Sequence, residues 1–126
     1  MLLLIVEDDH DIRISLAEFF LDEGYSVADA ADARDGLSKL RSLRPALVLL
    51  DYAVPERRDG EEFLRSKAAD PAVAAIPVIV MSGFQRLPEM DGVVAFITKP
   101  FGSEAILSLV QRFAGPPDNP DTRTAA

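Results

Sequence analysis

Cysteine is absent from the 126 residues, and histidine occurs only once, at His10. Without cysteine the chain forms no disulfide and offers no thiolate ligand to a metal. Nothing in the composition argues for an oxidising compartment, so we expect a cytoplasmic location. His10 stands next to three acidic residues where a helix should begin, and we interpret it as a surface residue.

Long hydrophobic runs are also absent. The apolar run after Met1 covers only 2–6, has no basic segment before it and stops at Glu7. A secretory signal needs about 7 to 15 apolar residues after a basic segment, and a membrane-spanning helix needs about 20. We expect neither, and no association with a membrane.

Positive charge is scarce. The chain has 13 lysines and arginines against 21 acidic residues, a formal net charge of −8, and its basic residues form no cluster. Such a surface repels nucleic acid and anionic lipid. We therefore expect no binding of nucleic acid.

The length and composition leave room for one folded domain. The proportions of 48% hydrophobic and 27% charged residues are ordinary for a globular protein. After Gly115 come two prolines and a segment without apolar periodicity. We predict a domain over 1–115 and a flexible, proline-containing tail over 116–126. We expect a monomer or a weak dimer.

Five short segments have the character of β-strands. Four are nearly continuous apolar runs, which are typical of buried strands in a parallel sheet. The segment 25–30 is more polar and suits an edge strand. The four apolar runs cover 2–6, 46–50, 76–81 and 93–97.

Segments with helical spacing separate these strands. Apolar residues recur there every three or four positions and make one stripe per helix. The alternation of strand and helix predicts an α/β fold, a doubly wound three-layer sandwich with right-handed crossovers. The clearest stripes are Ile12, Leu16, Phe19 and Phe20, and Ile106, Leu109, Val110 and Phe113.

Polar residues and glycines mark several helix boundaries. Asp32 is a candidate N-cap, and Ser103 can cap the last helix, which Gly115 can end. A weaker helix is expected after Gly60.

Charged and hydroxyl side chains follow the predicted strands at their carboxyl ends. In an open parallel sheet, ligands bind beyond these ends, where the strand order reverses. We interpret Asp9 as a charge at a helix N-terminus rather than a ligand. The residues at these ends are Glu7, Asp8 and Asp9, then Asp51, then Ser82 and Gly83, and finally Thr98, Lys99 and Pro100.

This set of side chains favours phosphoryl chemistry with a metal ion. Crowded carboxylates repel one another and need a cation, and ligands that are all oxygens suit Mg²⁺. A carboxylate can act as a nucleophile and form an aspartyl phosphate. Mg²⁺, the Lys99 ammonium, the Ser82 hydroxyl and the Gly83 backbone N–H could together stabilise charge on the phosphoryl oxygens.

Four segments in order resemble the receiver domain of bacterial two-component response regulators, in its stand-alone, single-domain form. The resemblance covers about residues 1–115. Each segment is weak alone, but four in this order are specific. They are Leu4–Asp9, Leu49–Pro55, Val80–Gly83 and Phe96–Phe101.

The resemblance implies a metal site and a phosphoacceptor. Glu7 and Asp8 would be the acidic pair that binds Mg²⁺, together with Asp51 and the backbone carbonyl of Ala53. Asp51 would accept a phosphoryl group from a histidine kinase, a phosphotransfer protein or a small acyl phosphate. The downstream protein target stays unknown.

The resemblance also implies a switch. Ser82 and Lys99 would contact the phosphoryl group, and Ser82, Gly83, Phe96 and Pro100 would respond to it. Phe96 is expected to combine this role with a place in the core. The Lys99–Pro100 bond is a candidate cis peptide.

In this family the five-stranded parallel sheet has the order 2-1-3-4-5, as in flavodoxin-like folds. One departure concerns the segment before the last strand, because only 84–92 is available there and it contains Pro88. We expect the fourth helix of the family to be short or irregular.

Two apolar residues bear on the lifetime of the aspartyl phosphate. Ala53 and Phe84 occupy positions whose side chains influence attack by water in receivers. Neither can hydrogen-bond a water, which predicts slow self-dephosphorylation. We expect no enzymatic activity beyond self-phosphorylation and this slow loss.

Two other classes of function stay open. A receiver fold can dock a partner without being phosphorylated, although the complete set of site residues argues against this. A phosphatase with an aspartyl nucleophile would typically carry Asp-x-Asp after the first strand, which Glu7-Asp8-Asp9 does not fit.

Overall fold

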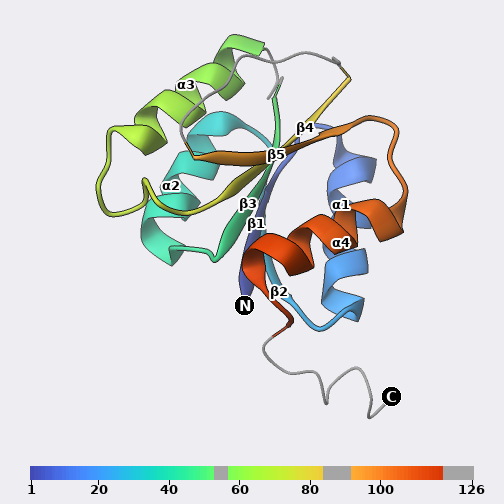
Figure 1. The fold of residues 1–126 in the computed structure, drawn as a ribbon. Coiled ribbons are helices and arrows are strands. Elements are labelled where there is room, and N and C mark those ends of the chain that lie inside the picture. Colours follow the sequence, from blue (N-terminus) through green and yellow to red (C-terminus); the bar gives the residue numbers. More distant parts are fainter. Residues whose placement is uncertain (53–56, 84–91, 118–126) are drawn as a thin grey trace.

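Five parallel strands form one sheet in the described residues of the computed structural model, which are 1–52, 57–83 and 92–117 (Figure 1). The strand order is β2-β1-β3-β4-β5, which confirms the predicted order. The strands are β1 (Leu2–Val6), β2 (Ser26–Ala30), β3 (Leu47–Asp51), β4 (Val78–Ser82) and β5 (Val93–Thr98).

The central strands are apolar because both of their faces are covered. Every residue of β3 and β4 is buried, as are all residues of β1 except Leu2. Strands that lie between two helical layers have no polar side. The edge strands differ: β2 is mostly half-buried, and β5 alternates between half-buried and exposed residues.

Helices cover both faces of the sheet, which confirms the three-layer sandwich. In Figure 1, α1 and α4 lie on one side of the sheet and α2 and α3 on the other. The helices are α1 (His10–Asp22), α2 (Ala33–Leu43), α3 (Arg57–Ala68) and α4 (Ser103–Ala114). The short or irregular helix predicted within 84–92 lies outside the described residues, apart from Gly92.

Each helical layer packs on its own core cluster. The layer of α1 and α4 contains both predicted apolar stripes, with Phe20, Ile106 and Val110 fully buried. The layer of α2 and α3 buries Leu40, Phe63 and Leu64 against the other side of the sheet. The predicted apolar stripes therefore identified the correct faces of α1 and α4.

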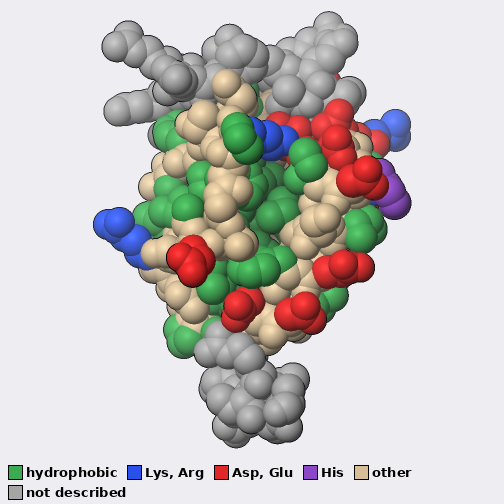
Figure 2. Space-filling model, turned by 90° about the vertical axis from the view of Figure 1, so that its right-hand side faces the viewer, with side chains coloured by type: hydrophobic (Ala, Val, Ile, Leu, Met, Phe, Trp, Pro, Cys, Tyr) green, Lys and Arg blue, Asp and Glu red, His purple; other side chains and the backbone are tan. Residues whose placement is uncertain are grey.

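The groove between α1 and α4 remains partly open to solvent. It has a volume of about 350 Å³, and its lining includes Ile12, Leu16 and Phe19 from α1 and Ile106 from α4. Figure 2 shows this side of the molecule, where hydrophobic side chains gather between acidic ones. Ile12 and Phe19 are consequently only partly buried. No helix in the described residues is long and apolar enough to span a membrane.

Helix boundaries follow the predictions in part. The Asp32 side chain accepts a hydrogen bond from the Asp35 N–H at 2.7 Å, and Gly115 ends α4 with a φ of 86°. The N-cap of α4 is Gly102, not Ser103, and it makes no side-chain capping bond. Ser103 is already the first helical residue, so its hydroxyl stands one position too late for that role.

The helix α3 begins before Gly60, not after it. Arg57 is its first residue, and Gly60 lies in its first turn. A Cβ atom at Gly60 would lie 1.9 Å from the carbonyl oxygen of Tyr52. The glycine therefore serves the close approach of α3 to the end of β3, and it does not interrupt the helix.

Replacing this glycine should destabilise the protein despite the better helix propensity of alanine. Gly60→Ala gains at most about 1 kcal/mol in propensity, whereas the clash with Tyr52 should cost about 2 to 3 kcal/mol. We expect a lower urea midpoint in unfolding followed by circular dichroism. The control is Gly102→Ala, where a Cβ meets nothing within 4 Å and only the N-cap preference for glycine is lost, so its midpoint should fall less. Equal midpoints for the two variants would contradict the packing argument.

Candidate functional site

Three carboxylates meet at the carboxyl ends of β1 and β3. Glu7 and Asp8 follow β1, and Asp51 is the last residue of β3. The two strands pair directly in the sheet. One oxygen from each carboxylate lies within 4.8 Å of the other two. The parallel sheet thus brings together residues that are more than forty positions apart in the chain.

Lys99 supplies positive charge to this cluster. Its Nζ lies 2.7 Å from Glu7 Oε1 and 3.6 Å from Asp51 Oδ2. The Lys99 backbone N–H donates to the Ser82 carbonyl at 2.7 Å, which extends the pairing of β5 with β4 beyond the strands. The Lys99–Pro100 peptide is cis, as predicted.

Burial and like charge dominate the electrostatics of the acids. Glu7 is fully buried, and this burial raises its pKa to about 8, with a further rise from Asp51 and an opposing effect from Lys99. Burial, followed by Asp51, also raises the pKa of Asp8. The raised pKa values are the expected response of crowded acids: once all three carboxylates are ionised, the single Lys99 ammonium cannot balance them, and the cluster carries excess negative charge.

The ammonium of Lys99 stays protonated in this setting. Burial lowers its pKa, but the hydrogen bond to Glu7 and the charges of Asp51 and Glu7 outweigh that effect, and the net shift is upward. Lys99 is therefore a cation and a donor, not a base.

The donor set fits a hard divalent cation. Glu7 Oε2 is buried and accepts no hydrogen bond within the described residues, and a buried carboxylate oxygen without a partner is costly. The three acids offer only oxygen ligands and leave positions for water and a further oxygen, which suits Mg²⁺. Ala53, the fourth predicted ligand, lies outside the described residues.

Three predicted switch residues lie near the cluster in the fold. Ser82 ends β4 and is buried, and Gly83 follows it in open space, since a Cβ there would meet nothing within 4 Å. Pro100 follows Lys99 across the cis bond. The structure therefore places Ser82, Gly83, Lys99 and Pro100 at the same edge of the sheet as the acids.

Phe96 is not a core residue, contrary to the prediction. Its side chain is 46% exposed. Its neighbours in β5, Ala95 and Ile97, point into the core cluster beneath α1 and α4, so Phe96 points to the opposite face. No described helix covers that face at β5, which is why a large apolar side chain remains exposed there.

The flanking residues Asp9 and His10 stay outside the carboxylate cluster. The Asp9 side chain accepts a hydrogen bond from the Ile12 N–H at 3.0 Å and caps α1, which confirms its assignment to the helix terminus. His10 is exposed, and its Nδ1 lies 3.2 Å from Arg13 Nη2.

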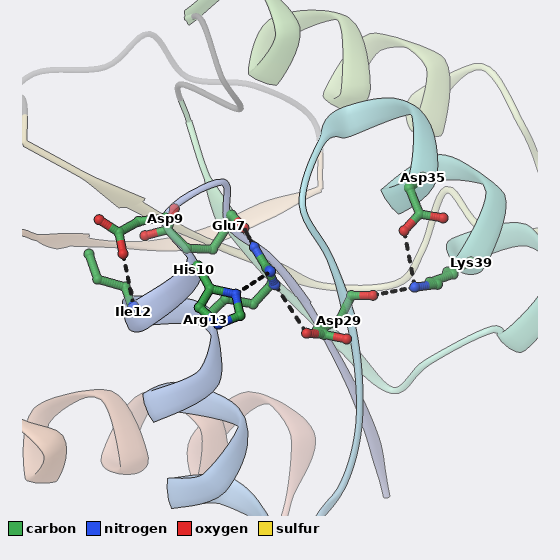
Figure 3. A network of polar contacts seen from close by, with 8 residues as sticks. All are labelled: Glu7, Asp9, His10, Ile12, Arg13, Asp29, Asp35 and Lys39. Atoms are coloured by element: carbon green, nitrogen blue, oxygen red, sulfur yellow. Dashed lines mark hydrogen bonds and ion pairs between the residues drawn. The ribbon is translucent and has the colours of Figure 1, made fainter.

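Arg13 is a residue that the sequence analysis missed. Its Nη1 donates to the Glu7 carbonyl at 3.0 Å, and its Nε donates to Asp29 Oδ2 at 3.1 Å (Figure 3). One signal was available: a basic residue in the first turns of a helix is electrostatically unfavourable unless it has acceptors elsewhere.

Relief of repulsion in the cluster gives a prediction for stability. Asp51→Asn removes the carboxylate that raises the pKa of both Glu7 and Asp8, so with a chelator present it should raise the free energy of unfolding by about 1 to 2 kcal/mol. Excess Mg²⁺ should stabilise the wild type by mass action and the variant less. Urea unfolding with and without Mg²⁺ measures both effects. Asp22→Asn, at an exposed position of α1, is the charge-matched control, and an identical Mg²⁺ response of wild type and Asp51→Asn would contradict the assignment.

Comparisons with known proteins agree with this geometry. A family model described as the response regulator receiver domain matches residues 3–111. Protein Rrf1 of Nitratidesulfovibrio vulgaris is 33% identical, with 98% of this chain and 93% of that protein covered. Sporulation initiation phosphotransferase F of Bacillus subtilis is 36% identical, over 88% of this chain and 91% of that protein.

Solved structures share the fold. Chemotaxis response regulator CheY4 of Vibrio cholerae has a TM-score of 0.80 and 26% identity, covering 89% of this chain and 97% of that chain. The receiver domain of the sensor histidine kinase PA1611 of Pseudomonas aeruginosa, with a magnesium ion coordinated in its active site cleft, also has a TM-score of 0.80, over 90% of this chain and 97% of that chain. At 24% identity this likeness shows the fold alone. With the family model spanning most of its length, the chain belongs to the response regulator receiver domain family.

Proposed function

We propose that this receiver domain is a phosphoacceptor switch in which Asp51 takes up the phosphoryl group. The observation that carries the proposal is the position of Asp51 between two acids and a cation. It shares the carboxylate cluster with Glu7 and Asp8, while Lys99 Nζ lies 3.6 Å from its Oδ2. A nucleophilic carboxylate is thus placed where the incoming phosphoryl charge can be balanced.

Glu7, Asp8 and Asp51 would hold Mg²⁺, with the Ala53 carbonyl as a further ligand. Receiver domains bind this ion at an acidic pocket, and the orphaned Glu7 Oε2 supports the same use here. When bound, the ion neutralises charge on the acids and on the phosphoryl oxygens.

The protein's own groups then account for the transfer step. An Asp51 oxygen attacks phosphorus in line, and a P–O bond forms while the bond to the leaving group breaks and its electron pair departs with that group. The leaving group is the imidazole of a phosphohistidine or the carboxylate of an acyl phosphate. Lys99 and the Ser82 hydroxyl stabilise the charge on the equatorial oxygens, because Lys99 is held protonated by its two acidic neighbours.

The new charge on Asp51 would act as the switch signal. Ser82 and Lys99 would be drawn to the phosphoryl oxygens, and Gly83, Phe96 and Pro100 would follow, which shifts an existing conformational equilibrium. The Phe96 ring, 46% exposed, has apolar surface to bury in the alternative state.

The proposal also covers the phosphoryl donor, the protein that receives the signal and the cellular location of this domain. The donor would be a histidine kinase or a phosphotransfer protein, and the output would pass to a protein target through surface contacts of a monomer or weak dimer. Receiver domains are signalling switches, and we propose no further enzymatic activity for this one. The absence of cysteine supports a cytoplasmic location.

Phosphorylation of Asp51 is tested directly by mass. Incubation with acetyl phosphate and Mg²⁺ should add one phosphoryl group that is labile to hydroxylamine, and no group should be added when a chelator is present from the start. Asp51→Asn should abolish the addition, whereas Asp22→Asn should keep it. Persistent labelling of Asp51→Asn would move the acceptor elsewhere. No labelling by acetyl phosphate or by a panel of histidine kinases would favour a phosphorylation-independent docking module.

The lifetime of the aspartyl phosphate tests a second part of the proposal. Ala53 and Phe84 lie outside the described residues, and their apolar side chains should leave an attacking water without a hydrogen-bond partner. Ala53→Asn and Phe84→Glu should therefore shorten the lifetime of the phosphorylated protein, measured by intact mass over time after the donor is removed. Unchanged decay in both variants would refute this explanation of slow self-dephosphorylation.

A further inference from the structure

The backbone of Glu7 is held on both sides of its Cα atom by contacts that lead to the end of β2. Its N–H donates to the Ala30 carbonyl at 3.0 Å. Its carbonyl accepts from Arg13 Nη1 at 3.0 Å, and Arg13 Nε is in turn bound to Asp29 Oδ2 at 3.1 Å (Figure 3). Two adjacent residues of one strand therefore fix the backbone of the buried metal-site acid, one directly and one through an arginine.

The guanidinium of Arg13 is built into this arrangement. Its side chain is only 14% exposed, and separate nitrogens of the rigid fork reach Glu7, Asp29 and His10. A lysine has one compact ammonium on a flexible stem and cannot reproduce such a fork. The contacts therefore depend on the shape of arginine as well as its charge.

Asp29 is itself anchored to the opposite helical layer. Its backbone carbonyl accepts a hydrogen bond from Lys39 Nζ, and Lys39 also pairs with Asp35 one turn earlier in α2 at 3.0 Å. Figure 3 shows the resulting series of contacts from the end of β1, through α1 and β2, to α2. Asp29, whose side chain accepts from Arg13 in α1, is therefore also held through its backbone by Lys39 in α2.

Repulsion within the carboxylate cluster makes such an anchor necessary. Glu7 and Asp8 lie on a short turn between β1 and α1, and their oxygens are within 4.8 Å of those of Asp51. When these carboxylates are ionised and no cation is bound, their repulsion favours movement of the turn away from β3. A hydrogen bond from a charged donor to the Glu7 carbonyl opposes that movement at its source.

We propose that Arg13, oriented by Asp29, is a positioning residue that keeps the Glu7–Asp8 turn in register with Asp51, so that the divalent-cation site is preformed. This inference rests on the proposed function. Geometry and not charge is the expected mechanism, because the charge of Arg13 is already balanced by Asp29 at 3.1 Å. Partners that orient metal ligands typically affect metal affinity about 10- to 100-fold.

The test is the Mg²⁺ affinity of the unphosphorylated protein, measured by isothermal titration calorimetry. Arg13→Gln should raise the Kd for Mg²⁺ about tenfold or more. Arg13→Lys keeps the charge but reaches only one of the two main acceptors, so its Kd should lie between those of the wild type and Arg13→Gln. Asp29→Asn should weaken binding in the same direction. The control is Arg41→Gln, which removes a half-exposed guanidinium paired with Asp70 and should leave the Kd unchanged.

A second readout separates positioning from general damage to the fold. At saturating Mg²⁺, Arg13→Gln should reach the same stoichiometry of labelling by acetyl phosphate as the wild type, because only the concentration dependence has changed. A merely structural role would lower the urea midpoint without changing the Kd of the folded protein. If Arg13→Gln fails to fold, Arg13→Lys and Asp29→Asn carry the same comparison.

The outcomes distinguish this inference from the proposed function. If the wild type binds Mg²⁺ and is labelled on Asp51 while the Arg13 variants bind Mg²⁺ equally well, the positioning role is wrong and the proposed function stands. The same holds if Arg41→Gln weakens binding as much as Arg13→Gln. If the wild type binds no Mg²⁺ and is not labelled, the proposed function fails and the positioning role fails with it.

Discussion

The mutual repulsion of Glu7, Asp8 and Asp51 is the constraint on which the rest of the site depends. A parallel sheet places the carboxyl ends of β1 and β3 side by side, and acids at both ends bring like charges within 4.8 Å. The fold tolerates this arrangement because Lys99 contacts Glu7 at 2.7 Å and because the turn is tied to neighbouring elements. An added cation lowers the electrostatic free energy of such a site, and an added phosphoryl group changes its charge balance. Both effects suit a switch.

The surrounding core explains why the repulsion does not simply open the molecule. Central strands buried on both faces make the positions of Glu7 and Asp51 consequences of strand register, with Val6 opposite Leu50 in the sheet. Moving either acid means disturbing apolar packing in two helical layers. The packing thus contributes the stability, and the polar edge of the sheet holds the electrostatic repulsion that a cation or a phosphoryl group would alter.

Sequence patterns could predict whatever depends on local spacing or on the end of a strand. The strand positions to within two residues, the Asp32 cap and the gathering of Glu7, Asp8, Asp51 and Lys99 belong to this group. The early start of α3 depends on the Tyr52 carbonyl next to Gly60, and the exposure of Phe96 depends on which face of β5 is covered. Arg13 was missed because its partner in β2 lies sixteen residues away, a distance at which periodicity carries no information.

The edge strand β2 shows how a polar sequence can have two causes. Its composition first indicated an edge position, and the sheet order agrees. Exposure alone, however, does not require an acid at position 29. The backbone carbonyl of Asp29 accepts a hydrogen bond from Lys39, and the carbonyl of the next residue, Ala30, accepts one from the Glu7 N–H. These groups lie at the carboxyl end of β2, level with the end of β1, because Ile5 pairs with Asp29 and Val6 with Ala30. The register of the edge strand β2 therefore sets the backbone position of Glu7, which we propose as a metal ligand.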